Sequence, residues 1–227
     1  MRIQWTGTAL AIAMVASSLM PAAALNDGAR TIALPAVRRD SGVALEKTLS
    51  ARRSVREFGA ASLRLPEVAQ LLWAAQGVTA PGGYRTAPSA GALYPLEIYV
   101  VAARVVKLAP GVYRYDPAGH RLVAIASEDR GSELARAAYG QNWLSEAPLI
   151  LALAGVERRT TRKYGQRGER YVLLEAGHAA QNTLLQAVAL GLGATVVGAF
   201  DDDGVRKVLD LEAGEQPLYL IPVGRPR

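Results

Sequence analysis

Residues 171–190 read YVLLEAGHAAQNTLLQAVAL and form the clearest helical pattern in the chain. Apolar side chains cover nearly every side of a helical wheel drawn for it, which is typical of a helix buried in the middle of a protein. We therefore expect a buried central helix that ends where Gly191 and Gly193 follow. His178 lies within it, and we expect a hydrogen-bonded core side chain there rather than a metal ligand.

The segments around this helix alternate irregularly between helical and extended patterns. The apolar run from Leu149 to Ala154 predicts a central strand. A turn at Asp116–Gly119 predicts a hairpin. Because helices and strands follow one another without regular alternation and include a hairpin, the sequence favours an α+β fold with a largely antiparallel sheet. We also expect helices at Val43–Ala51, from Leu65 to Gly77, at Ser132–Leu144 and at Asp202–Leu209, strands at Glu97–Ala103 and Leu218–Val223, and a polar surface excursion at Arg158–Arg170.

The first 24 residues are typical of a secretory signal peptide. Arg2 precedes an apolar run that is too short to span a bilayer, and Pro21 and a small-residue cleavage site follow it. An uncleaved anchor or a misassigned start codon is the alternative. We expect an exported, periplasmic protein with a signal at 1–24, an extended arm at 25–44, one domain at 45–227 and no membrane contact after cleavage.

The composition excludes several classes of function. The chain has 227 residues, no cysteine and two histidines, so it has neither disulfides nor thiolate ligands and a histidine-rich metal centre is excluded. The net charge of +6 favours anionic ligands, but the arginines are dispersed, and we expect no nucleic-acid partner.

Two segments are candidates for binding a small ligand. Arg52, Arg53, Ser54 and Arg56 put three guanidinium groups and a hydroxyl within five residues, which suits a phosphate. The alternative is a solvated basic helix end. The small residues of the 88–95 segment allow a flat ligand to approach the backbone, or they form a simple loop.

These segments together resemble the nitroreductase family of flavin enzymes over about residues 45–227. The similarity is greatest to its SagB-type dehydrogenases, which include azoline oxidases of peptide-modifying pathways. The motifs that carry the resemblance are RRSVREF (52–58), RTAPSAGALYPLE (85–97), KYGQRG (163–168), YVLLEAGHAAQN (171–182), GLGATVVGAF (191–200) and PVGRP (222–226).

The resemblance implies an interlocked homodimer that binds FMN in two sites at the subunit interface. Arg52 and Ser54 match positions that hold the ribityl phosphate and ribitol, Arg53 lies between them, and Arg56 matches a basic position at the N1/C2-oxygen edge of the ring. The other cofactor-binding positions implied are Pro88, Ser89 and Ala90, lent by the other protomer; Gly198 and Ala199, near flavin N5; and Arg225 or Arg227, at the phosphate.

Lys163 and Tyr164 resemble the Lys-Tyr pair that azoline oxidases use around the base step. A lysine beside a tyrosine can take up a proton while a flavin accepts a hydride. The alternative is a basic surface loop. Ala92 departs from the family, because classical nitroreductases often carry an amide residue there.

We therefore expect an exported FMN-dependent oxidoreductase that acts on a small-molecule substrate by two-electron transfer. NAD(P)H is the usual donor in the family, and another donor is required if none reaches the protein outside the cytoplasm. A non-catalytic flavin-binding partner in a biosynthetic complex is the alternative, and a basic protein that binds anionic lipid is a third.

Overall fold

A seven-stranded antiparallel sheet forms the centre of the protein in the computed structural model, which describes residues 30–227. The strand order is β1-β6-β5-β3-β7-β9-β8, and a separate parallel pair joins β2 to β4. The α+β prediction with an antiparallel sheet is confirmed. The strands are β1 Thr31–Ala33, β2 Leu63–Arg64, β3 Leu96–Ala102, β4 Val105–Val106, β5 Gly111–Asp116, β6 Arg121–Ala126, β7 Leu149–Gly155, β8 Gly193–Ala194 and β9 Gln216–Gly224.

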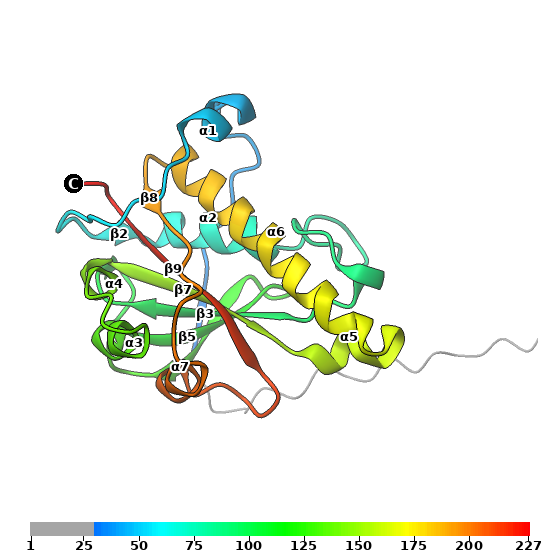
Figure 1. Cartoon of the computed structure of the whole chain (residues 1–227). Coiled ribbons are helices and arrows are strands. Elements are labelled where there is room, and N and C mark those ends of the chain that lie inside the picture. Colours follow the sequence, from blue (N-terminus) through cyan, green and yellow to red (C-terminus); the bar gives the residue numbers. More distant parts are fainter. Residues whose placement is uncertain (1–29) are drawn as a thin grey trace, which may run out of the picture.

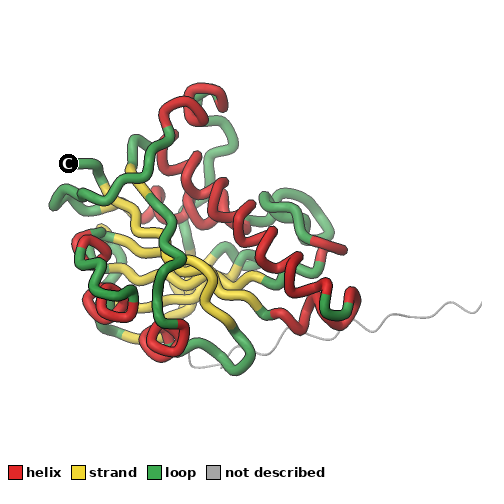
Figure 2. Tube along the Cα trace, in the orientation of Figure 1, coloured by secondary structure: helices red, strands yellow, loops and turns green. Residues whose placement is uncertain are grey.

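Helices cover both faces of this sheet (Figure 1). One face packs on α2 and α6, and the other packs on α3, α4 and α7. Figure 2 shows the strands enclosed between these two groups of helices. The helices are α1 Leu45–Ala51, α2 Leu65–Gln76, α3 Gly131–Ala137, α4 Trp143–Glu146, α5 Glu157–Tyr164, α6 Arg167–Ala189 and α7 Asp202–Leu209, with a single 3₁₀ turn at Ala90–Ala92.

The central strand β7 is buried along its whole length, as its apolar run predicts. Successive side chains of a strand point to opposite faces. Leu151 and Leu153 accordingly join the core beneath α2 and α6, whereas Ile150 and Ala152 join the core beneath α3, α4 and α7. One strand therefore contributes to two hydrophobic cores.

The boundaries of α2 follow from its sequence. Pro66 lies in its first turn, where a missing N–H costs nothing. The Glu67 carboxylate accepts a hydrogen bond of 2.8 Å from the backbone N–H of Arg64 and so caps the helix start. Gly77 ends the helix, and its N–H donates to the Trp73 carbonyl oxygen at 2.7 Å.

Two local predictions are wrong, and a third is right about exposure but does not foresee a helix. The helix expected at Ser132–Leu144 is interrupted, because Tyr139 and Gly140 have φ values of 55° and 76° and separate α3 from α4. The polar segment Arg158–Arg170 lies mostly at the surface, as expected, but it is helical: α5 and the start of α6 occupy most of it. His178 is exposed rather than buried, because one face of α6 points away from the core.

The expected signal peptide at 1–24 lies outside the described residues. The described part of the expected arm contains β1, which pairs with β6 at the sheet edge. Among the described helices, none combines the length and the apolar character that a bilayer span requires.

Candidate functional site

The arginine segment lies against β8, although more than a hundred residues separate the two in the sequence. Ser54 forms an isolated parallel bridge with Ala194, and the backbone N–H of Val55 donates to the Ala194 carbonyl oxygen at 3.1 Å. Gly193 makes this close approach possible, because a Cβ there would lie 2.7 Å from the Val55 side chain. The chain thus brings Arg52–Arg56 and the segment leading to Gly198 into one strip.

Arg56 and Ala199 are linked through the loop before α4. The Arg56 guanidinium lies 5.8 Å from the centre of the Trp143 ring, which is within cation–π range. Gln141, two residues earlier, donates its side-chain amide to the Ala199 carbonyl oxygen at 3.0 Å. Gly198 and Ala199 are exposed, so their backbone is open to a ligand.

The cations of this strip lack carboxylate partners in the part of the chain that the structure describes. Arg52, Arg53 and Arg56 take part in no ion pair there. The Arg53 guanidinium is held by the carbonyl oxygens of Ser50 and Arg52, at 3.0 and 2.7 Å. Arg52, Arg56 and the exposed Ser54 therefore remain available for an anion, which is the donor set that a phosphate requires.

The two tail arginines lie near this strip but are already paired. Arg225 contacts the buried carboxylate of Glu67 at 2.5 Å, and Arg64 contacts the same carboxylate at 3.0 Å. Burial raises the pKa of Glu67, but the hydrogen bonds from Arg64 and Arg225 outweigh it and leave the pKa below its usual value. Arg227 lies 3.7 Å from Glu146.

Lys163 and Tyr164 meet at the 88–95 segment. A Cβ placed on Gly91 would lie 2.8 Å from the Tyr164 hydroxyl oxygen and 2.9 Å from Lys163 Nζ. Gly91 has a φ of 64°, which favours glycine. The two polar groups therefore fill the space that a side chain at Gly91 would occupy, and Lys163 Nζ lies 5.4 Å from the centre of the Tyr164 ring.

A polar network lies beneath this loop. Gln76 donates to the Glu175 carboxylate at 3.3 Å and accepts from Arg85 at 3.1 Å. The Arg85 guanidinium lies 4.5 Å from the centre of the Tyr94 ring, and Ser89 Oγ accepts from the Tyr94 backbone N–H at 2.8 Å. The network thus connects α2 and α6 to the loop that contains Pro88, Ser89 and Ala90.

Charge in this network is mostly desolvated. Burial raises the pKa of Glu175, while hydrogen bonds from Ser89 and Gln76 and the charge of Arg85 oppose the rise. Burial likewise lowers the pKa of Arg85, and the charges of Glu97 and Glu175 oppose that change.

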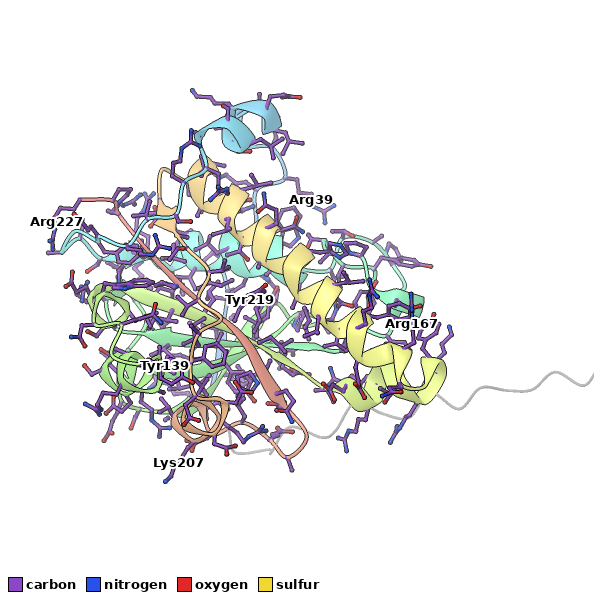
Figure 3. All side chains as sticks on the ribbon, viewed as in Figure 1. Arg39, Tyr139, Arg167, Lys207, Tyr219 and Arg227 are labelled. Carbon is purple, nitrogen blue, oxygen red and sulfur yellow. The ribbon has the colours of Figure 1, made fainter. Side chains whose placement is uncertain are left out.

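The predicted residues thus fall into two groups at opposite ends of α6. Tyr164 lies just before its first residue, whereas β8 and the arginine strip follow its last. A helix of 23 residues is about 34 Å long at 1.5 Å per residue. Arg167 and Arg227 lie at opposite sides of the molecule in Figure 3. Two hollows of about 540 and 290 Å³ contain none of the predicted site residues.

Sequence reasoning missed several residues of these two groups. Gln141 and Trp143 carry no motif, and only the fold brings them to Ala199 and Arg56. Gln76 also belongs to no recognisable motif, although its amide joins Glu175 to Arg85.

A family model described as "Nitroreductase family" matches residues 49–225. A Methanocaldococcus jannaschii protein that is named as a nitroreductase is 50% identical over 183 residues, which cover 81% of this chain and 91% of that protein. A crystal structure from Ralstonia eutropha, titled as a nitroreductase, has a TM-score of 0.77 at 33% identity and covers 92% of this chain and 95% of that one. The microcin B17-processing protein of Escherichia coli is 29% identical over 138 residues, covering 58% of this chain and 51% of that protein.

Proposed function

The chain belongs to the nitroreductase family, and from this premise we propose that it is an FMN-dependent oxidoreductase. The observation that carries the proposal is the strip in which Arg52–Arg56 and the segment leading to Gly198 and Ala199 meet through the bridge between Ser54 and Ala194. One end of this strip carries Arg52 and Arg56, which have no carboxylate partner in the described chain. The other end carries the exposed backbone of Gly198 and Ala199. A mononucleotide with an anionic tail and a flat ring requires both.

The residues present fit FMN. Arg52 and Ser54 would hold its phosphate and ribitol, and Arg56, supported by Trp143, would place a positive charge near the ring. A fixed cation favours a reduced ring that carries negative charge. When bound, FMN supplies two-electron hydride chemistry. Arg225 is paired with Glu67, so it would contribute less to phosphate binding than Arg52 would.

We propose that the protein acts as a homodimer in which each site takes one group of residues from each protomer. A single mononucleotide is too short to reach from the arginine strip to Ser89 and Lys163 along most of α6. Four exposed leucines support the proposal, because apolar side chains on a surface favour a contact with another chain. Leu45 and Leu49 of α1 are 58% and 51% exposed, and Leu173 and Leu174 of α6 are 58% and 51% exposed.

Lys163 and Tyr164 are proposed as the catalytic pair at this composite site. Both polar groups lie beside Gly91, in a loop that the partner's flavin would contact, and both can hold or move a proton. The similarity to the microcin B17-processing protein favours the SagB-type branch for this chain. We propose that Lys163 or Tyr164 takes up a proton from a small heterocyclic or related substrate while its hydride goes to the flavin, with dioxygen or a quinone as the final electron acceptor. In the reductive direction, NAD(P)H is the hydride donor.

The absorbance spectrum of the purified protein tests this function. We expect a yellow protein with about one FMN per protomer, bleached by NADH or NADPH under anaerobic conditions. A colourless protein that does not bind added FMN refutes the proposal. A bound flavin that no donor reduces supports the non-catalytic partner instead.

We further propose export of the protein after removal of residues 1–24. Amino-terminal sequencing of protein from the periplasmic fraction is expected to begin near Leu25. A full-length amino terminus in the cytoplasmic fraction contradicts this proposal.

A further inference from the structure

We propose that Tyr171 and Glu175, one turn apart on α6, are positioning residues that hold the 88–95 loop in register with Lys163 and Tyr164. The inference rests on the proposed function, because the register matters only where these groups share a reaction site. Neither residue is placed in contact with flavin or substrate. Both act through the groups that they support.

Tyr171 supports the Tyr164 side chain. The two rings pack edge to face, with centres 5.2 Å apart and planes at 85°. Tyr164 is the last residue of α5, and Gly165 follows with a φ of 58°, so the chain turns sharply there. A ring at such a turn depends on a tertiary contact for its orientation, and Tyr171 supplies it.

Glu175 supports the 88–95 loop, which lies on the other side of the contact between Gly91 and Tyr164. Glu175 is buried, with only 2% of its surface exposed. Its carboxylate accepts from Gln76, and Gln76 in turn accepts from Arg85, whose guanidinium stacks on Tyr94. The backbone N–H of Arg85 also donates to the Tyr94 hydroxyl at 3.2 Å. Arg85, which precedes the loop, and Tyr94, near the end of the loop, are thereby linked through Gln76 to one carboxylate.

The two supports share one rigid element. Residues four apart lie on the same face of a helix, so Tyr171 and Glu175 point to the same side of α6. Tyr164 and the loop are therefore positioned from one helix face, and Gly91 lies where they meet. A shift of either support changes the distance between the Gly91 backbone and the tips of Lys163 and Tyr164.

A purely structural role does not account for Glu175. Burying a carboxylate is costly, and an apolar residue of similar size usually gives equal or greater stability. The hydrogen-bond donors to Glu175 are the neutral groups of Gln76 and Ser89, and the nearby cation Arg85 is bonded to Gln76 rather than to the carboxylate itself. This arrangement favours geometric control of the loop.

Variants of the FMN-loaded dimer test the proposal. Glu175→Ala leaves the Gln76 amide without its acceptor, and we expect reduction of a nitroaromatic acceptor by NAD(P)H, which requires a proton at the acceptor, to slow about tenfold through the shift of the loop. Glu175→Gln retains an acceptor and is expected to stay within about threefold of the wild type. Tyr171→Leu is expected to slow reduction, whereas Tyr171→Phe keeps the ring contact and the rate. The circular dichroism of the bound flavin reports the loop position in each case.

Thr183→Val is the matched control. Thr183 is fully buried on α6, and its hydroxyl bonds to the Ala179 carbonyl oxygen within the same helix. We expect this variant to lower the melting temperature while the reduction rate and flavin spectrum stay unchanged. The proposal is overturned if Glu175→Ala and Tyr171→Leu behave like Thr183→Val, or if Glu175→Gln is as slow as Glu175→Ala. A wild-type protein that binds no FMN overturns the proposed function itself.

Discussion

Replacing Gly91 by alanine tests the contact between the loop and the Lys163–Tyr164 pair. The new Cβ would lie 2.8 Å from the Tyr164 hydroxyl oxygen and 2.9 Å from Lys163 Nζ. Because ordinary contacts are about 3.5 Å, the two groups must move by about 0.7 and 0.6 Å. A misplacement of about 1 Å at a reaction site costs about 100-fold in rate, so we expect about tenfold slower turnover per bound flavin.

The same substitution also strains the backbone, and this effect must be separated from the contact. Gly91 has a φ of 64°, and a left-handed conformation costs an alanine about 1 kcal/mol. In a domain of this size, that loss lowers the melting temperature by about 2–4 °C. Lys163 is a flexible side chain and can yield, so the fold itself is expected to survive.

Gly83→Ala separates the two effects. Gly83 has a φ of 79° in the neighbouring loop, but a Cβ there would meet no atom within 4 Å. We expect both variants to lose similar thermal stability in differential scanning fluorimetry. Only Gly91→Ala is expected to slow the turnover of a nitroaromatic acceptor per bound flavin. Equal rates for the two variants would refute the placement of Lys163 and Tyr164 at the reaction site.

Three further predictions concern the cofactor strip, a buried carboxylate and the dimer. Arg52→Ala is expected to weaken FMN binding about tenfold in a fluorescence titration. Arg53→Ala is expected to weaken it less, because backbone carbonyl oxygens already hold the Arg53 guanidinium. Equal losses of affinity for the two variants contradict this prediction. Burial raises the pKa of Glu67, but hydrogen bonds from two arginines outweigh it and hold this pKa below its usual value. The ionised carboxylate therefore stabilises the fold above the unfolded-state pKa of about 4.3, and this stabilisation is lost as the pH falls through the folded-state pKa. Glu67→Gln should therefore lower the melting temperature at pH 7 but much less near pH 3, and a constant difference contradicts the assignment. Leu174→Glu, with a charge on the exposed face of α6 beside Leu173, is expected to give monomers in light scattering and to lose FMN; an intact dimer contradicts the proposed interface.

Much of the fold could be predicted from local patterns. The strand β7 was predictable because six consecutive apolar residues suit a strand buried on both faces. The start and end of α2 were predictable because Pro66, Glu67 and Gly77 act within a few residues of themselves. The interruption between α3 and α4 was not, since Tyr139 adopts a left-handed conformation that its residue type does not signal.

The site was predictable where one segment supplies a complete chemical group. The guanidiniums of Arg52 and Arg56 are such a case, and the structure leaves them without a carboxylate partner in the described chain. Contacts between distant segments were not predictable in the same way. Nothing in the sequence announces that Gln141 reaches Ala199, because that hydrogen bond spans 58 positions.

The pattern of α6 carries information on assembly that a single chain does not express. An apolar side chain on nearly every face predicts burial all round, yet Leu173 and Leu174 are more than half exposed. Both observations agree if a second copy covers that face, since sequence patterns are selected in the working assembly rather than in an isolated protomer. The same helix separates the arginine strip from Lys163 by most of its length, so the partner that covers its exposed face is also positioned to bring the missing half of each site. The exposed leucines and the divided site therefore have one explanation, and the Leu174→Glu variant tests both at once.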